Sequence, residues 1–193
     1  MIEYLNGQIV ELNPAHVVID VNGIGYFVHI SLNTYSALSG HKTTRLLIHE
    51  LIREDLHALY GFHDFDERDL FRMLISVSGV GANTGILFLS SLTGNELKQA
   101  IVSGDVNKLK SVKGIGLKTA QRIIVELKDK LEKTPLTANI FATPNNTARE
   151  EALSALVTLG FVKKSAEKVI DKILSENPDQ PVEQIIKVAL KQM

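Results

Sequence analysis

The sequence predicts an α+β protein of several domains: a small N-terminal β-barrel, an all-α middle domain and a C-terminal three-helix bundle. Short β-branched runs punctuated by glycine fill residues 1–64. The apolar spacing becomes helical from Asp66, and residues 134–147 contain two prolines and no charge. We therefore expect domains at 1–64, 65–133 and 148–193, with 134–147 as a flexible linker.

The N-terminal region is expected to close into a barrel of short strands. Asn22-Gly23 separates two apolar runs and is a strong hairpin signal, because both residues tolerate the positive φ angles of a tight turn. The size favours an OB-type barrel, and an SH3-like barrel fits the same pattern. The expected strands are Ile9–Leu12, Val17–Val21, Tyr26–Ile30, Leu46–Ile52 and Leu56–Tyr60.

The C-terminal segment is expected to form three short helices. Thr147 and Glu150 have the spacing of a capping box, in which a hydroxyl and a carboxylate satisfy free N–H groups at a helix start. Apolar residues then recur at helical spacing in three runs, the first of which ends at Gly160. The runs contain Ala152, Leu153, Leu156, Val157 and Leu159; Ala166, Val169, Ile170, Ile173 and Leu174; and Ile185, Ile186, Ala189 and Leu190.

Composition excludes several classes of protein. The chain has no cysteine, so disulfides and thiolate metal sites are excluded. No apolar run approaches the roughly 20 residues that span a bilayer, and Glu3 lies where a signal peptide carries bases. We therefore expect a cytoplasmic protein with no membrane partner.

The net charge of −1 conceals a basic segment. Residues 107–133 hold eight Lys/Arg against three Asp/Glu, whereas residues 1–64 hold three against seven. A basic segment inside a neutral chain is typical of phosphate binding. A solvated helical face explains the charge alone equally well.

An internal repeat with a period of 35 residues is the most informative feature. Ser76–Gly85 and Ser111–Ala120 share Ser, Val, Gly, Gly and Thr at the same offsets, in the helix-hairpin-helix pattern. The glycines permit a tight turn and the close approach of a phosphate, and the second helix directs its free N–H groups and positive dipole end toward that phosphate. The expected DNA-binding residues are Gly79, Val80, Gly81, Gly114, Ile115, Gly116, Lys118, Thr119 and Arg122.

The two copies differ in charge. Lys118 and Arg122 add cations to the second copy, whereas the first copy has Ala82 and Asn83 at the start of its second helix. One copy alone is equally consistent with an ordinary helix–helix turn, and two aligned copies beside a basic segment favour DNA. Such contacts fix a protein on the DNA backbone and carry no base-sequence information.

With the barrel and the repeat together, the chain resembles the RuvA family of bacterial Holliday-junction branch-migration subunits over essentially its full length. The resemblance implies an OB-fold domain, a tandem helix-hairpin-helix domain and a tethered third domain. It also implies a fourfold tetramer, or an octamer of two tetramers, on a four-way junction, with the hexameric ATPase RuvB and the resolvase RuvC as partners. The supporting stretches are Val21–Tyr26, Arg53–Asp55, Leu59–Phe62, Glu67–Phe71, both hairpins, Val125–Asp129 and Ala155–Phe161.

The resemblance also suggests roles for two further groups of residues. Glu54 and Asp55 lie at a predicted hairpin tip, which by itself is a solvated turn; in this family the turn is an acidic pin that repels the DNA backbone at the junction centre. Relatives commonly carry Pro and Lys where this chain has Ala82 and Asn83, so the first hairpin is expected to hold phosphate less strongly. The third domain is expected to present apolar residues to RuvB, for which the candidates are Leu156, Leu159, Phe161 and Leu190.

Enzyme functions fit the sequence less well. There is no Gly-x-x-x-x-Gly-Lys-Ser/Thr loop, so ATP hydrolysis is assigned to the partner. We expect no catalytic residue, no cofactor and no metal, because the adjacent Glu54 and Asp55 point to opposite sides of an extended chain and the six histidines lack zinc spacing. A helix-hairpin-helix glycosylase is the enzyme alternative, with Glu126 and Asp129 as its nearest acids, and a protein-only adaptor is the third possibility.

Overall fold

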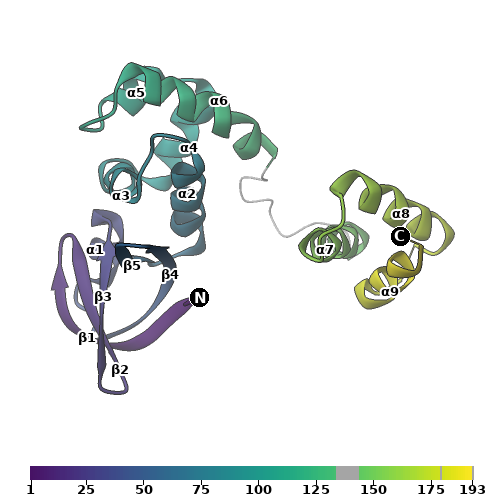
Figure 1. Cartoon of the computed structure of the whole chain (residues 1–193), viewed down its shortest axis with the longest axis horizontal. Helices are drawn as coiled ribbons and strands as arrows, with labels where there is room; N and C mark the ends of the chain where they lie inside the picture. Colours follow the sequence, from purple (N-terminus) through teal and green to yellow (C-terminus); the bar gives the residue numbers. More distant parts are fainter. Residues whose placement is uncertain (134–143, 179, 193) are drawn as a thin grey trace. The chain divides into compact units, whose positions relative to one another are not determined.

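The structure, a computed structural model, describes residues 1–133, 144–178 and 180–192. The chain divides into two compact units, Met1–Pro135 and Leu136–Met193 (Figure 1). The expected fold class is confirmed: a β-barrel, a helical region with two hairpins, and a three-helix bundle. Within the predicted linker, residues 134–143 lie outside the described residues.

Five strands close the barrel in the order β1-β2-β3-β5-β4. β3 and β5 pair in parallel, and the other neighbouring pairs are antiparallel. This five-stranded closed sheet is of the OB type, which decides between the two barrels that the pattern allowed. The strands are β1 (Tyr4–Asn13), β2 (His16–Val21), β3 (Ile24–Ile30), β4 (Thr43–Arg53) and β5 (Leu56–Phe62).

The predicted Asn22-Gly23 turn is confirmed, and one helix of the barrel was not predicted. Asn22 and Gly23 both have positive φ, +54° and +87°, as a two-residue hairpin requires. Helix α1 (Leu32–Leu38) connects β3 to β4. Its start is fixed by Ser31, whose hydroxyl accepts the Thr34 N–H at 3.0 Å. A helix of seven residues is too short for apolar periodicity to indicate it.

The barrel has its own hydrophobic core, and one face of β5 also packs into a second core that the middle helices form. Helix α2 follows β5 directly and is capped by Asp64, whose carboxylate accepts the Glu67 N–H at 2.7 Å. Tyr60 and Phe62 of β5 are buried against Phe71 of α2, with ring centroids 5.2 and 4.9 Å apart. The middle helices are α2 (Phe65–Ser76), α3 (Ala82–Ser91), α4 (Gly94–Ser103), α5 (Val106–Lys110) and α6 (Leu117–Lys133).

The second unit is a bundle of α7 (Pro144–Thr158), α8 (Lys163–Glu176) and α9 (Val182–Gln192). The prediction of a capping-box start at Thr147 is wrong, because α7 already begins at Pro144. Proline suits the first turn of a helix, since its φ is fixed and its missing N–H is not needed there. None of the described helices in either unit is long and apolar enough to cross a membrane.

Candidate nucleic-acid interface

The first hairpin turn joins α2 to α3. Gly79 has a φ of +90°, a conformation that other L residues rarely adopt. The Val80 N–H donates to the Val77 carbonyl at 3.0 Å, and both side chains are buried, so the turn is anchored from inside. Gly81 begins α3 without a side-chain hydrogen bond to its first N–H groups, and its carbonyl accepts the Gly85 N–H at 2.9 Å.

The second turn, between α5 and α6, repeats this geometry. Gly114 has a φ of +87°. The Ile115 N–H donates to the Val112 carbonyl at 3.2 Å, and both side chains are again buried. The Gly116 carbonyl accepts the Ala120 N–H at 3.0 Å. The sequence repeat is therefore also a repeat of backbone conformation and hydrogen bonding.

At the second glycine of each turn, the fold itself does not require glycine. A Cβ at Gly81 or Gly116 would meet no heavy atom of the described residues within 4 Å. Gly81 has a φ of −85°, which any residue adopts. A serine, threonine or aspartate is the usual means of satisfying the N–H groups that follow. The missing side chain leaves those N–H groups open to an anion.

The last residue of each repeat is small for a different reason: it packs against neighbouring side chains. A Cβ at Gly85 would lie 3.0 Å from the Phe71 ring, tighter than ordinary contact. Its counterpart Ala120 is fully buried. These positions hold the two helices of each hairpin together, and they are not part of the DNA-facing surface.

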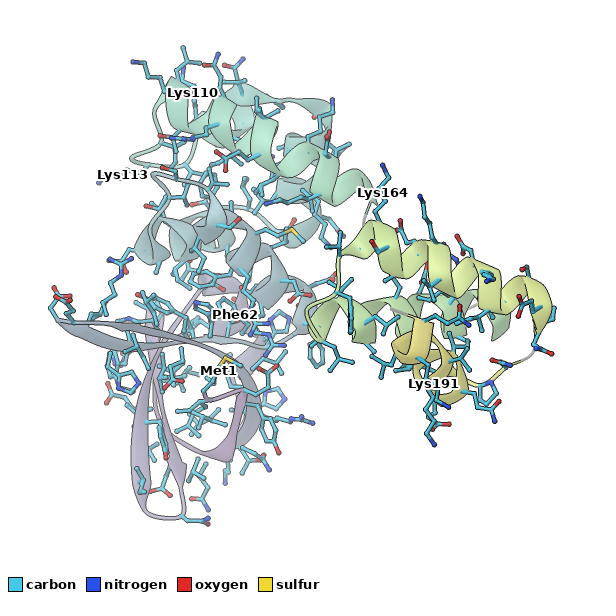
Figure 2. The ribbon with its side chains drawn as sticks, turned by 45° about the vertical axis from the view of Figure 1, so that its right-hand side comes forward. Met1, Phe62, Lys110, Lys113, Lys164 and Lys191 are labelled. Carbon is cyan, nitrogen blue, oxygen red and sulfur yellow. The ribbon has the colours of Figure 1, made fainter. Side chains whose placement is uncertain are left out.

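The second turn carries exposed cations. Lys118 is exposed and Thr119 is half-buried at the start of α6. Lys113, next to Gly114, is exposed too, and Figure 2 shows the side chains of Lys110 and Lys113 directed away from the helices. Among the described residues, neither Lys113 nor Lys118 has an ion-pair partner. Lys113 is not among the predicted DNA contacts, although it occupies the repeat position of the neutral Ser78 in the first copy.

Arg122 differs from the other predicted DNA contacts. Its Nε donates to Glu126 Oε1 at 2.9 Å, one turn further along α6. The guanidinium is therefore already paired with a carboxylate, whereas Lys113 and Lys118 are not, and Arg122 remains a predicted DNA contact. In the first hairpin the corresponding surface has no cation: Ala82 is buried, and Asn83 is exposed and neutral.

The acidic turn lies where the sequence predicts it. The register of β4 and β5 ends with Arg53 opposite Leu56, which leaves Glu54 and Asp55 as the two turn residues. Both are exposed. Figure 2 shows this hairpin extending beyond the rest of the barrel. The two carboxylates are thus presented at the end of a pair of antiparallel strands.

The barrel histidines pack as aromatic rings. The His16 ring stacks on Phe27 with centroids 4.5 Å apart, and His29 stacks on Tyr60 at 5.3 Å. Burial, and then the neighbouring His16, lower the pKa of His29 and favour its neutral form. No cluster of three or more His, Cys, Asp or Glu side chains suited to a metal occurs in the part of the chain that the structure describes.

In the second unit, Leu156 is a core residue, which removes it from the four candidates for an exposed apolar patch. It is fully buried between the helices, because α7 directs it with Ala152 into the bundle core. Leu159 and Leu190 are 61% and 44% exposed. Phe161 is half-buried at a cavity of about 440 Å³ that Val162, 70% exposed, also lines. The exposed apolar surface therefore includes Val162, which the sequence analysis missed.

Comparisons with known proteins agree over the whole chain. Three family models match in order: RuvA N terminal domain at residues 1–61, SAM-like helix-hairpin-helix tandem at 71–129, and RuvA C-terminal domain at 147–193.

Relatives named Holliday junction branch migration complex subunit RuvA match at full length. Those of Christiangramia forsetii, Bacteroides fragilis and Flavobacterium psychrophilum are 50%, 51% and 49% identical to this chain. Each alignment covers 100% of both proteins. The chain combines a duplicated hairpin turn, an acidic hairpin and a terminal bundle, and these relatives match it over its full length. The chain therefore belongs to the RuvA family.

Proposed function

We propose that this chain is the DNA-binding subunit of a Holliday-junction branch-migration complex. It is a non-enzymatic scaffold that holds a four-way junction open and recruits the hexameric ATPase RuvB in recombination and DNA repair. It works in the cytoplasm as a homotetramer, and one tetramer or a pair of tetramers binds the junction. The observation that supports this function most is the pair of turns with matching backbone geometry in one compact unit.

Each turn holds one phosphate through the N–H groups at the start of its second helix. The helix dipole adds roughly half a positive charge there, and Lys113 and Lys118 add full charges at the second turn. All these groups contact the DNA backbone, so binding depends on DNA shape and salt rather than on base sequence. Selectivity for a junction then comes from how several such units are arranged.

The acidic turn supplies the opposing force. Glu54 and Asp55 are exposed at the tip of a strand pair and meet DNA phosphates as like charges. Four copies at the centre of a tetramer repel the backbones there and favour separated strands at the crossover. On linear duplex the same charges only weaken binding, so they also contribute to discrimination.

The direct test compares a four-way junction with a linear duplex of the same sequence in a competitive mobility-shift assay. The intact chain should retain the labelled junction against an excess of duplex. Changing Glu54→Gln and Asp55→Asn together should raise duplex binding and shrink the preference for the junction. Equal competition by duplex and junction would contradict the proposed function.

The bundle of the second unit is the proposed RuvB-binding part. Leu159, Phe161, Val162 and Leu190 provide exposed or half-exposed apolar surface, which in a folded domain often marks a partner site. Truncating an aromatic anchor costs about 2 kcal/mol, or roughly thirtyfold in affinity. Phe161→Ala should therefore weaken RuvB binding and leave junction binding unchanged. Glu176→Ala, at the opposite end of α8, is the matched control and should change neither.

A glycosylase function has little support in this structure. Of the acids near the second hairpin, Glu126 pairs with Arg122 and Asp129 is exposed on α6. Neither is held in a pocket that receives a base. Base release from duplex DNA by the purified chain would revive this alternative, and a complete failure to bind DNA at low salt would favour the protein-only adaptor.

A further inference from the structure

The first hairpin is fastened to the barrel through four polar residues, Ser31, Asn33, Thr34 and Glu67, which we call the joint. We infer that the joint sets the position of the first hairpin turn relative to the acidic turn, and that Asn33 and Glu67 are positioning residues for junction recognition. This inference rests on the proposed function. It concerns how the two DNA-facing elements are held in register, not which groups touch DNA.

Glu67 is the centre of the joint. Its side chain is buried, and one carboxylate oxygen accepts the Ser31 hydroxyl. The other oxygen accepts the Thr34 hydroxyl at 2.5 Å and lies 3.0 Å from His63 Nδ1. A buried carboxylate is costly unless its oxygens are hydrogen-bonded. Since its partners come from α1 and from the segment before α2, this carboxylate favours one arrangement of barrel and helix over others.

Asn33 extends the joint to α3. Its Nδ2 donates to the carbonyls of Leu89 and Leu92 at 2.6 and 3.2 Å, at the C-terminal end of α3. The neighbouring Leu32 N–H donates to the Ser90 hydroxyl at 3.1 Å. Figure 1 shows α1 between the barrel and α3. The barrel therefore holds α3 by its C-terminal end, and the N-terminal end with its open N–H groups is the part presented to DNA.

The acidic turn and the first hairpin turn lie at opposite ends of one continuous segment. β5 begins just after Asp55, His63 and Asp64 connect it to α2, and α2 leads into the turn at Gly79. The His63 N–H also donates to Thr34 Oγ1 at 3.2 Å, so the connection itself is part of the network. The joint lies at the bend between β5 and α2.

Small rotations at this bend have large consequences at the DNA. Twelve residues of α2 span about 18 Å at 1.5 Å per residue. A rotation of about 10° at the joint moves the first turn by roughly 3 Å, on the order of a hydrogen-bond length. The hairpin would still be intact and could still bind a phosphate, but it would no longer meet the junction in register with the acidic turn.

A purely structural role makes a different prediction from a positioning role. If the joint only stabilised the fold, its loss would weaken junction and duplex binding together as the folded fraction fell. If it positions the hairpin, junction binding falls alone, because a linear duplex needs no register with the acidic turn. The second hairpin lies outside the joint, so it maintains duplex binding as long as the protein stays folded.

The test uses the full-length chain with Asn33→Ala, Thr34→Val and Glu67→Gln, each checked for folding by circular dichroism. Binding to a junction and to a duplex is measured by fluorescence anisotropy. A 2-aminopurine base at the crossover reports unstacking on binding. The matched controls are Glu96→Gln and Asp171→Asn, each of which removes the charge of a hydrogen-bonded carboxylate that is not part of the joint.

In the joint variants, the ratio of junction affinity to duplex affinity should fall at least about tenfold, which corresponds to 1.4 kcal/mol. The 2-aminopurine signal should fall with it, while duplex affinity stays within about twofold. The controls should retain both signals. Folded joint variants that keep the preference, or that lose junction and duplex binding equally, would overturn the inference. If the unmodified chain shows no preference for the junction, the proposed function itself fails and this inference with it.

Discussion

The two hairpin turns have nearly the same backbone and very different surroundings. Gly79 and Gly114 differ by only 3° in φ, +90° against +87°. The first turn follows a twelve-residue helix that is docked on the barrel, and it has no exposed cation. The second follows α5, a helix of five residues, and carries Lys113 and Lys118. Backbone geometry therefore defines where a phosphate fits, and side chains determine how strongly it is held.

This difference suggests a division of labour. We expect the second turn, with its cations, to provide most of the affinity for the DNA backbone. We expect the first turn, which the joint holds to the barrel, to determine how DNA is oriented. The neutral Asn83 should weaken the phosphate contact of the first turn without altering its backbone.

Placing side chains at the second glycines of the turns should lower junction affinity more than the other changes. The size of each loss also shows which turn contributes more to that affinity. Gly116→Val places a side chain beside the open N–H groups, at a position where an added Cβ meets no heavy atom within 4 Å apart from its own chain neighbours. It should lower junction affinity by about tenfold or more, equivalent to 1.4 kcal/mol. Gly81→Val should cause a smaller loss. Anisotropy titrations with folding checked by circular dichroism provide the measurement, and a greater loss at Gly81 would reverse the ranking.

Removing the cations of the second turn should cause the next largest loss of DNA affinity. With Lys113→Ala and Lys118→Ala together, fewer counterions are released on binding. The slope of log affinity against log salt should fall by about 2 per chain that contacts DNA, to the same extent for different base sequences. A salt titration measures it. An unchanged slope would mean that these lysines are solvated side chains and not phosphate contacts.

Adding a cation to the first turn should make the two copies more alike. Asn83→Lys places a positive charge at the start of α3, where the position is already exposed. The salt slope should rise by about 1 per chain that contacts DNA, with tighter binding at low salt. Asn83→Gln, of similar shape and no charge, is the control. If lysine and glutamine behave alike, the first turn does not face DNA.

Arg122→Ala should have a smaller effect than loss of either lysine. Its guanidinium is already paired with Glu126, so the charge available to DNA is reduced. Glu126→Gln should release it and strengthen binding slightly. The two single variants, compared in the same titration, separate these contributions. A loss with Arg122→Ala as large as that of the lysine pair would show that Arg122 leaves Glu126 when DNA binds.

Glu96, which pairs with Lys108 of the helix before the second turn, should give the smallest effect. Its loss should change the stability of the fold and leave DNA binding unchanged. The Thr93 backbone N–H, followed by Lys108, lowers the pKa of Glu96 to about 2 from its usual 4.5. Because the folded pKa is depressed, the ionised carboxylate stabilises the fold above pH 4.5, and that contribution disappears as the pH falls toward 2. Glu96→Gln should lower the melting temperature at pH 7 but not near pH 2. An equal decrease at both pH values would point to lost shape complementarity.

Features set by a few neighbouring residues were predictable from the sequence. The hairpin turns and the Asn22-Gly23 turn follow from glycine positions, since each needs a local φ that few other residues adopt. The acidic tip follows from three polar residues between two apolar strands. These signals require no knowledge of what packs against them.

The joint was not predictable from the sequence, because it depends on contacts between distant parts of the chain. Glu67 meets Ser31 and Thr34 only after the barrel has closed, and no spacing in the sequence links residues 36 and 33 positions apart. Leu156 shares its apolar stripe with exposed neighbours, so periodicity alone could not assign it to the core. The pairing of Arg122 with Glu126 has an ordinary i, i+4 spacing and was predictable in principle.

Hydrogen exchange of backbone amides, with and without a four-way junction, tests the central claim most directly. The account predicts slower exchange on DNA binding at the first turns of both α3 and α6, near Asn83 and Lys118. The first turn of α4, which Thr93 and Glu96 already cap, should not change. Protection near Lys118 alone would show that the first hairpin does not hold DNA, and protection at neither turn would contradict phosphate binding by the repeat.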